Sequence, residues 1–457
     1  MSLPKHSCTV GLPAFFRNRR SVRVAAVTIC ITYILFTIWP RQQLQESAKL
    51  FAHDLCQNNQ LANDIVVGVH TGASEASERI PVLMETSLRC AKNVFIFSDL
   101  EQDIGRYHLY DALVDISPEV RKLDPIFEFY RLQQEAWERD GNVNSTKGMK
   151  TVDDPNTSAA WTLDKYKFAH ILEKLWEHAP EKEWYVLIDA DTYVVWPNLL
   201  SWLPSLDSAK KMFLGSVAFL GPNPFAHGGS GTVFSKALMY DYAVVHNGTA
   251  ARLDPEVHKS CCGDAVIGDV LKEYGNSLIN MQPEITGHTP SSIPWRANYW
   301  CQPALTMHHL KERDMRAFYE FETGRGNKTT HITWAEVFGA LVKEQVQSMP
   351  DMQEDWDNYS NVADLWSGIP SDGANKNSTQ EFEECAKICE ADANCFQYSW
   401  DGQDCFRGQS IRLGERTKPG GKKWRSGWHQ PRIEEWISKQ PPCNDANVAD
   451  GSKRVHY

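Results

Sequence analysis

The chain lacks an excess of basic residues and any visible internal repeat. Its 457 residues include 47 Lys and Arg against 58 Asp and Glu, which gives a net charge of -11. An acidic chain is a poor ligand for a phosphate backbone, so the balance argues against a nucleic-acid-binding protein. With 42% hydrophobic and 23% charged residues, the composition also excludes a wholly disordered or fibrous chain.

Long apolar runs are scarce, and one of 16 residues lies near the N-terminus, at positions 24–39 (VAAVTICITYILFTIW). A membrane-spanning helix usually needs about 20 apolar residues and about 17 at the least, although thin membranes accept shorter spans. Arg17, Arg19, Arg20 and Arg23 precede the run, and Trp39-Pro40-Arg41 is a poor cleavage site for the alternative, a cleaved signal peptide. We expect a cytoplasmic tail at 1–23, a single signal-anchor helix at 24–39 and a stem at 40–60, hence a type II membrane protein with a lumenal catalytic part.

Cysteines and glycosylation triplets suit an oxidising, lumenal compartment. Twelve cysteines are too few for a disulfide miniprotein but enough for several bridges. The candidates for disulfide bonds, whose pairing the sequence leaves open, are Cys56, Cys90, Cys261, Cys262, Cys301, Cys385, Cys389, Cys395, Cys405 and Cys443. The candidates for N-glycosylation are Asn144, Asn156, Asn247, Asn327, Asn358 and Asn377.

Strand-like and helix-like segments alternate over residues 64 to about 340. Apolar runs predict strands at 64–72, 93–99 and 183–189, and helical spacing of apolar residues predicts helices at 78–91 and 163–178. This alternation indicates an α/β domain with a largely parallel sheet. The polar stretch 140–158 is expected to be a surface loop. We place the α/β domain at 61–340, a linker at 341–375 and a separate disulfide-rich module at 376–445.

Two carboxylates follow the third predicted strand. Asp189-Ala190-Asp191 comes directly after the apolar run WYVLI, where ligands bind in open α/β sheets. Two acids at this spacing can turn toward one Mg²⁺ or Mn²⁺ ion, which would neutralise a departing diphosphate. A solvated pair of turn acids is the alternative.

Three further segments carry polar or glycine-rich patterns. Residues 227–231 (HGGSG) form a predicted turn whose bare amides can approach a ligand. Asp264 begins a helix-like run, where N-capping is the simpler role. His308 and His309 stand at a predicted strand end, where the alternative is one buried and one exposed structural histidine.

These segments, in this order, resemble glycosyltransferase family 31, which contains fringe and core 1 β1,3-galactosyltransferases. The resemblance covers roughly residues 60 to 325 and is most specific in IDADTYV (188–194), GGSGTVFS (228–235), GDAVIG (263–268) and TMHHL (306–310). It implies a GT-A fold, which is Rossmann-like, and an inverting transfer of galactose or N-acetylglucosamine from a UDP-sugar to a glycan or glycoprotein. It also implies Mn²⁺ (or Mg²⁺), a β1,3-linkage and a place in the Golgi or endoplasmic reticulum membrane.

The resemblance also assigns roles to residues. The metal motif falls on Asp189 and Asp191, and the metal-binding histidine falls on His308, with His309 as the weaker substitute. The catalytic base falls on Asp264; the acid that usually precedes it is replaced by Gly263. Residues that resemble positions near the nucleotide-sugar are Thr71, Arg79, Asp99, Lys165, Ala190, Gly228 and Gly229.

The cysteine-rich stretch near the C-terminus has a pattern of its own. Cys385 and Cys389 share one face of a predicted short helix, so disulfides can pin that helix to a strand. A zinc site is the alternative, but no histidine accompanies these cysteines. The stretch 370–430 resembles the PAN/Apple module, an α+β fold whose relatives bind protein or carbohydrate.

The function predicted from the sequence is therefore glycosyl transfer by a metal-dependent hexosyltransferase. Two alternatives stay open. One is a catalytically silent carbohydrate-binding or adhesion protein that acts through the PAN/Apple-like module, and the other is a metal-dependent hydrolase of nucleotide-sugars. Tryptophans such as Trp196, Trp295 and Trp300 are candidates for stacking on sugars, although a tryptophan is more often part of the core.

Overall fold

The computed structural model describes residues 60–325, 331–362, 376–418, 420–443 and 454–457. Cys56, Asn327 and the segments expected to be the cytoplasmic tail, anchor and stem lie outside the described residues. Within the described part of the chain, no helix is long and apolar enough to cross a membrane. The prediction of a membrane partner, with the Golgi membrane location that depended on it, is contradicted by this finding.

The α/β expectation is confirmed by a mixed sheet of eight strands. Its order is β11 (Leu278–Asn280), β7 (Phe213–Gly215), β10 (Thr232–Ser235), β5 (Trp184–Asp189), β1 (Ile65–His70), β2 (Asn93–Ser98), β4 (Tyr107–Asp111) and β3 (Gln102–Ile104). The central strands β5, β1, β2 and β4 are parallel, whereas β10 is antiparallel to both β5 and β7. The last described residues extend this sheet, because Leu278 and Tyr457 exchange both backbone hydrogen bonds, at 3.0 and 2.8 Å.

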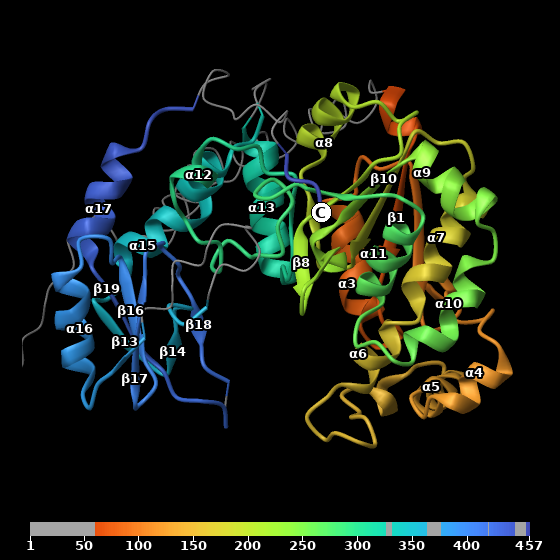
Figure 1. Cartoon of the computed structure of the whole chain (residues 1–457), viewed down its shortest axis with the longest axis horizontal. Coiled ribbons are helices and arrows are strands. Elements are labelled where there is room, and N and C mark those ends of the chain that lie inside the picture. Colours follow the sequence, from red (N-terminus) through yellow and green to blue (C-terminus); the bar gives the residue numbers. More distant parts are fainter. Residues whose placement is uncertain (1–59, 326–330, 363–375, 419, 444–453) are drawn as a thin grey trace, which may run out of the picture.

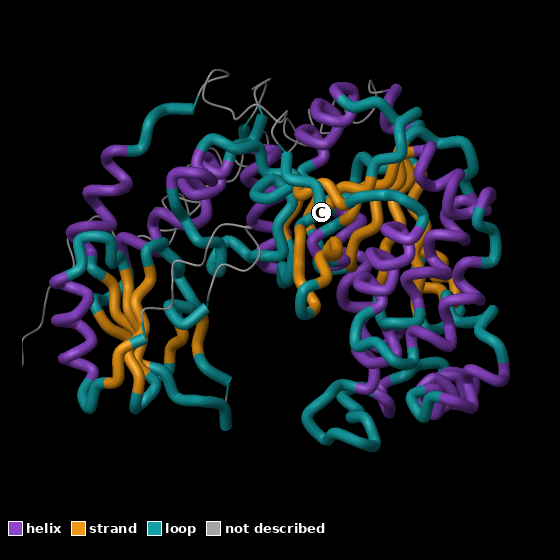
Figure 2. Tube along the Cα trace, in the orientation of Figure 1, coloured by secondary structure: helices purple, strands orange, loops and turns teal. Residues whose placement is uncertain are grey.

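Helices cover both faces of this sheet, as Figure 2 shows. The helices of this part are α3 (Ala73–Glu85), α4 (Pro118–Leu123), α5 (Phe127–Asp140), α6 (Ala159–Asp164), α7 (Lys167–His178), α8 (Trp196–Trp202), α9 (Lys236–Tyr240), α10 (Thr249–Val257), α11 (Gly263–Glu273), α12 (Ala297–Trp300), α13 (Glu312–Gly324), α14 (Trp334–Val337) and α15 (Lys343–Ser348). Successive residues of β1 belong to two different cores: Val67 packs with α3 and α13, and Val66 packs with α7 and α11. This alternation is what a strand buried on both faces requires.

Two small two-stranded sheets flank the main one and lie near the candidate site. The first pairs β6 (Tyr193–Val194) with β12 (Thr306–Met307), and the second pairs β8 (Val217–Leu220) with β9 (Asn223–Ala226). Because β12 ends at Met307, the β6–β12 pair brings His308 next to the turn that follows β5.

The C-terminal module is a second sheet with two helices, separate from the first in Figure 1. Its five antiparallel strands are β13 (Met352–Glu354), β19 (Arg425–Trp428), β16 (Gln397–Trp400), β17 (Asp404–Gly408) and β15 (Asn377–Ser378), beside the pair β14 (Trp356–Asp357) and β18 (Glu415–Arg416). The helices are α16 (Phe382–Ala391) and α17 (Gln430–Lys439). Strands β13 and β14 lie in the range expected to be a linker, yet they pair with β19 and β18.

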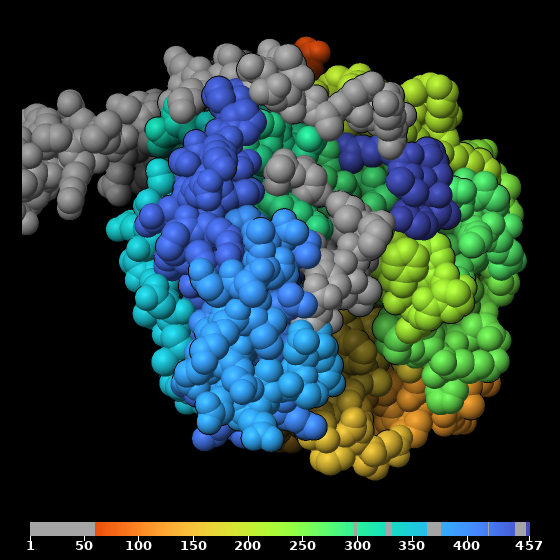
Figure 3. Space-filling model, turned by 60° about the vertical axis from the view of Figure 1, so that its left-hand side comes forward, coloured from red at the N-terminus to blue at the C-terminus, as the bar shows by residue number. Residues whose placement is uncertain are grey.

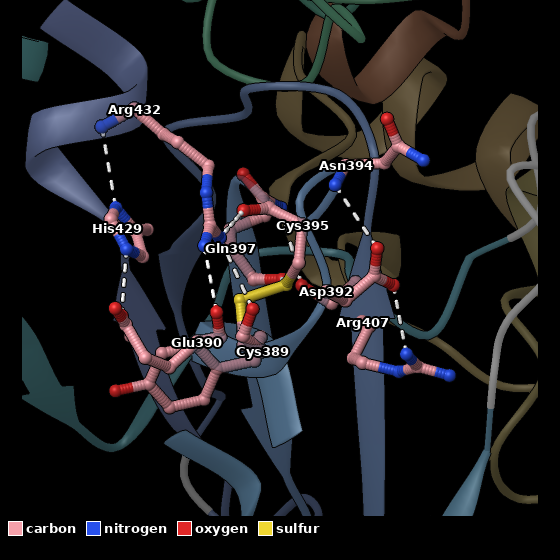
Figure 4. Close-up of a disulfide and its surroundings, with 12 residues drawn as sticks. Cys389, Glu390, Asp392, Asn394, Cys395, Gln397, Arg407, His429 and Arg432 are labelled. Atoms are coloured by element: carbon pink, nitrogen blue, oxygen red, sulfur yellow. Dashed lines mark hydrogen bonds and ion pairs between the residues drawn. A yellow bond between two sulfur atoms is a disulfide. The ribbon is translucent and has the colours of Figure 1, made fainter. Parts of the chain in front are cut away.

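Disulfides fasten this module as the cysteine pattern indicated. Cys385 of α16 is bonded to Cys405 of β17, and Cys389 is bonded to Cys395, which closes the end of the helix. In Figure 4 the guanidinium of Arg432 lies beside this second bridge, where it donates to the backbone oxygens of Cys389 and Cys395 at 3.1 and 2.8 Å. A cation at these carbonyls satisfies and complements the C-terminal end of α16.

The remaining bridges join other parts of the chain. Cys301 is bonded to Cys443 across 142 positions, and Cys261 is bonded to its neighbour Cys262. Cys90 is also disulfide-bonded.

One glycosylation prediction is wrong. Asn358 is 0% exposed, and its amide donates to the backbone oxygens of Tyr398 and Gly427 at 3.1 and 3.2 Å. A glycan on this nitrogen has no room in the fold. By contrast, Asn144, Asn156, Asn247 and Asn377 are exposed, so they stay candidates.

Candidate active site

The carboxyl ends of β1 and β5 open on one cavity. Asp189 is the last residue of β5 and lies beside His70, the last residue of β1. The backbone N–H of Ala190 donates to the His70 oxygen at 3.0 Å, so the two strand ends stay together as the chain turns. Parallel strands end at the same edge, which is where open α/β sheets hold ligands.

The acid pair and His308 lie within reach of one another. The His308 Nε2 atom lies 3.1 Å from Asp191 Oδ1 and 3.5 Å from Asp189 Oδ2. Burial opposes the charged form of His308, but hydrogen bonds to the two carboxylates outweigh it and raise its pKa to about 9. Burial raises the pKa of Asp191, yet hydrogen bonds to His308 and His309 hold that pKa below its usual range. His308 is shared by the two acids, while Arg79 also pairs with Asp191 and His70 with Asp189.

The glycine-rich turn after β9 holds this histidine on one side. Gly229 has no Cβ, and an added one would lie 2.2 Å from the His308 ring. The Gly229 oxygen accepts a hydrogen bond from Thr192 Oγ1 at 2.6 Å, directly after the acid pair. Glycine is thus required here because the imidazole packs against bare backbone.

The same turn holds Asp264 on its other side. The Gly228 N–H donates to Asp264 Oδ2 at 2.9 Å, and the Ala265 N–H donates to Oδ1 at 2.9 Å. Burial raises the pKa of Asp264 to about 6, against the opposing effect of these backbone donors. Asp264 is therefore ionised at neutral pH and still basic enough to accept a proton.

Gly263 explains why no second acid precedes Asp264. A Cβ at this position would lie 2.2 Å from the backbone oxygen of Lys165, at the end of α6. The backbone of α11 and the end of α6 are in direct contact, and no larger side chain fits between them.

Most of the residues singled out from the sequence line a single cavity of about 490 Å³. The predicted site residues around it are Thr71, Arg79, Lys165, Asp189, Asp191, Gly229, Asp264 and His308. Arg79 reaches Asp191 with an N–O distance of 3.0 Å. The structure thus gathers the acid pair, the histidine and the candidate base from three separated segments.

Other expected residues sit behind the cavity wall. Asp99 is 1% exposed and accepts from the Ala73 N–H at 2.6 Å, so it caps the first turn of α3. Ala190 is buried in the core, and Gly228 backs onto Phe168. Lys165 borders the cavity, but its amine pairs with Asp124 at 3.2 Å.

A buried charged chain behind the acid pair was not predicted. His70 Nδ1 lies 2.9 Å from Asp189 Oδ1, and its Nε2 lies 3.0 Å from Asp164 Oδ1. Burial disfavours the charged imidazole, but Asp164 outweighs this effect and raises the pKa of His70 to about 9. Lys167, 1% exposed, donates to the Thr71 oxygen at 2.8 Å and also pairs with Asp164. The stretch 163–168 (LDKYKF) contains two lysines, and from the sequence we single out Lys165 instead of Lys167.

The tryptophan hypotheses are also corrected. Trp196 and Trp295 are each 1% exposed in the core, and Trp300 packs on Phe338 and Trp436. The tryptophan that lines the cavity is Trp161, which is 58% exposed. No periodic signal marked it, because α6 is only six residues long.

The residues present fit a divalent cation. One ligand atom each from Asp191, His308 and His309 lie within 4.8 Å of one another. The expected ligands were Asp189, Asp191 and His308, so this group contains His309 in place of Asp189. Carboxylate and imidazole ligands together suit first-row divalent metals, and Asp189 adjoins the set through its contact with His308.

Comparisons with known proteins add little to this geometry. No family model and no curated protein matches the sequence. Among solved structures, a glycosyltransferase involved in the glycosylation of the major capsid of PBCV-1 aligns with 56% of this chain and 99% of its own, at 13% identity and a TM-score of 0.26. A TM-score this low does not establish a common fold, and membership of family 31 is not established either.

Proposed function

We propose that the protein is a metal-dependent glycosyltransferase that moves a hexose from a nucleoside diphosphate sugar to a hydroxyl group. The observation that carries this proposal is the placement of Asp191, His308 and Asp264 around one cavity of about 490 Å³. One turn separates the candidate base from the candidate metal ligands, since Gly228 binds Asp264 and Gly229 packs on His308. A single displacement needs this arrangement, because the base and the leaving group act on opposite sides of the sugar.

The chain's own residues account for the steps around the sugar. Asp264 takes the proton of the acceptor hydroxyl as the hydroxyl oxygen attacks the anomeric carbon, and this attack inverts the configuration at that carbon. Asp191 and His308, with Asp189 or His309, would hold the cation, which when bound stabilises the negative charge on the departing diphosphate. Arg79, held at Asp191, places a further positive charge on that side of the cavity.

The finer details of the proposal depend on the family 31 resemblance of the four motifs. UDP as the nucleotide, Mn²⁺ as the cation, galactose or N-acetylglucosamine as the sugar and a β1,3-linkage all come from it. The same holds for the GT-A fold and for a PAN/Apple-like C-terminal module that binds protein or carbohydrate.

Variants of the proposed metal ligand Asp191 and of the proposed base Asp264 should behave differently in an assay of donor binding. UDP-sugars that raise the melting temperature in the presence of Mn²⁺ identify the donor, because a ligand of the native state stabilises it. Asp191→Asn should abolish the metal-dependent stabilisation. Asp264→Asn should keep this stabilisation. It should lower sugar transfer to the acceptor, measured as UDP release, by about 10²- to 10⁴-fold, the usual contribution of a general base.

Lys272→Gln is the control, because Lys272 is exposed on the same helix as Asp264 and does not line the cavity, so this loss of a charge should leave both measurements unchanged. Normal transfer by Asp264→Asn would refute the base assignment. Nucleotide binding without turnover would favour the silent carbohydrate-binding alternative, and full UDP-sugar cleavage without acceptor would favour the hydrolase.

A further inference from the structure

Two kinds of residue line the cavity. The charged residues include Asp191, Arg79 and Glu75, and Arg79 pairs with both of these acids. The uncharged residues include the aromatic side chains of Trp161, Phe168 and Phe225 and the disulfide of Cys261 and Cys262. A metal–diphosphate group requires the charged residues, so the uncharged ones are left for another part of the substrates.

The disulfide forms an uncharged wall directly before the candidate base. Cys262 is the N-cap residue of α11, and Asp264 follows two positions later. Cys262 packs on a small cluster of Ala218, Phe225 and Ala265. A disulfide has no N–H or O–H donor, and its polarisable sulfurs suit contact with C–H groups or aromatic rings.

Trp161 lies on α6, lines the same cavity and is largely exposed. It is 58% exposed on α6, where the hydroxyl of Ser158 accepts its backbone N–H at 3.4 Å. Lys165, four residues later at the end of α6, touches Gly263 through its backbone oxygen. The end of α6 and the disulfide therefore both adjoin the start of α11, which carries Asp264, and Trp161 and the disulfide line the same cavity as that carboxylate. A large exposed aromatic surface in a cavity is typical of a binding site.

A second groove continues beyond the disulfide. It has a volume of about 580 Å³ between α10 and α11, and Cys261 borders both it and the main cavity. Its charged residues carry both signs: Arg252, Glu256, Lys259, Asp269 and Glu273. A mixed set of exposed polar groups suits a neutral chain rich in hydroxyl groups better than a strongly charged ligand.

We propose that Trp161 and the Cys261–Cys262 disulfide form the acceptor subsite and that the acceptor is a neutral glycan of more than one sugar. The apolar C–H face of its terminal pyranose lies on the indole and the disulfide, with the attacking hydroxyl at Asp264. The next sugar extends past Cys261 into the second groove. This inference rests on the proposed function, because it assumes that the charged residues of the cavity hold the donor.

The test measures acceptor and donor affinity separately in Trp161 variants. The probes are methyl β-glycosides of two kinds. The first are the monosaccharides galactose, glucose and N-acetylgalactosamine, and the second are disaccharides with one of these sugars at the terminal position. Their binding to the Mg²⁺–UDP complex of the protein is followed by saturation-transfer NMR, and their KM by UDP release. Trp161→Ala should weaken acceptor binding at least tenfold and leave the Kd for Mg²⁺–UDP unchanged, whereas Trp161→Phe should retain most of the affinity.

Tyr240→Ala is the matched control, because Tyr240 is a 47% exposed aromatic residue that does not line the cavity. In the wild-type protein, the disaccharides should bind more tightly than the matching monosaccharides. Acceptor binding that is equal in Trp161→Ala and wild type would overturn the inference, as would a parallel loss of Mg²⁺–UDP affinity. Failure of wild type to bind Mg²⁺–UDP at all would instead overturn the proposed function.

The disulfide is tested with the double variant Cys261→Ser, Cys262→Ser. It should bind Mg²⁺–UDP as wild type does and bind the disaccharide several-fold more weakly. An unchanged disaccharide affinity would remove the disulfide from the subsite. If the double variant does not fold, the Trp161 series decides the question.

Discussion

The environment of the Asp264 carboxylate raises its pKa above that of an ordinary acid. It is held by two backbone N–H groups, yet burial wins and its pKa rises from 3.8 to about 6. An acid with this pKa is charged at pH 7 and accepts a proton more readily than an exposed aspartate does. The balance between burial and backbone donors thus sets its strength as a base.

The pH profile of the reaction should report this value. Only the ionised form of Asp264 accepts a proton, so kcat/KM should be level above pH 7 and fall about tenfold per pH unit below pH 6. The measurement is kcat/KM from pH 4.5 to 8 at saturating metal, with donor binding followed over the same range. A profile that stays level down to pH 4.5 while donor binding is constant would contradict the assignment.

At this scale, sequence reasoning found residue types but not their partners. Asp189, Asp191, His308 and Asp264 were selectable because short motifs mark them, and they line one cavity. Lys167 and His70 were missed, because a buried lysine or histidine is recognisable only once Asp164 is seen between them. Trp161 was missed because exposure on a short helix leaves no periodic pattern.

Among the elements, the turn Gly228–Ser230 has the largest effect on the site. It binds Asp264 through one residue and packs against His308 through the next, so it fixes the spacing between the two roles. The strand ends were predictable from apolar runs: β1, β2 and β5 fall inside the predicted ranges. The helix expected over 163–178 is interrupted between Asp164 and Lys167, which lets the backbone at Lys165 meet Gly263.

A methyl group in this turn should disable the metal ligands and spare the fold. In Gly229→Ala the new Cβ would lie 2.2 Å from the His308 ring, so the imidazole must move. We expect at least a tenfold loss of Mn²⁺ affinity, measured by calorimetric titration. Gly324→Ala is the control, since nothing lies within 4 Å of its Cβ. Equal Mn²⁺ affinity in the two variants would show that His308 is not a ligand.

On the scale of the whole molecule, the C-terminal module is joined to the site through a shared core. Ile411 and Trp295 exchange backbone hydrogen bonds at 3.0 and 3.2 Å, and both belong to the core that includes β1 and β5. Figure 3 shows the module as a continuous blue surface beside the green and yellow of the α/β part. The backbone N–H of His308 donates to the backbone oxygen of His288 at 3.3 Å, so the segment that meets the module at Trp295 also contacts the proposed metal ligand.

This long-range arrangement was beyond sequence reasoning, which treated 341–375 as a linker. The pairing of β13 with β19 joins residues more than 70 positions apart, and no local pattern specifies such a partner. Disulfide pairing was equally open: Cys301 and Cys443 meet only because the chain returns to the first core after the module.

The most direct test of the account is the position of the metal in a crystal of the protein grown with Mn²⁺ and UDP. Anomalous scattering from manganese locates the ion without reference to the protein atoms. The account predicts one peak bonded to Asp191 and His308, with the UDP phosphates on the ion and Asp264 across the cavity from it. A peak bonded to other residues, or UDP bound elsewhere, would contradict the account.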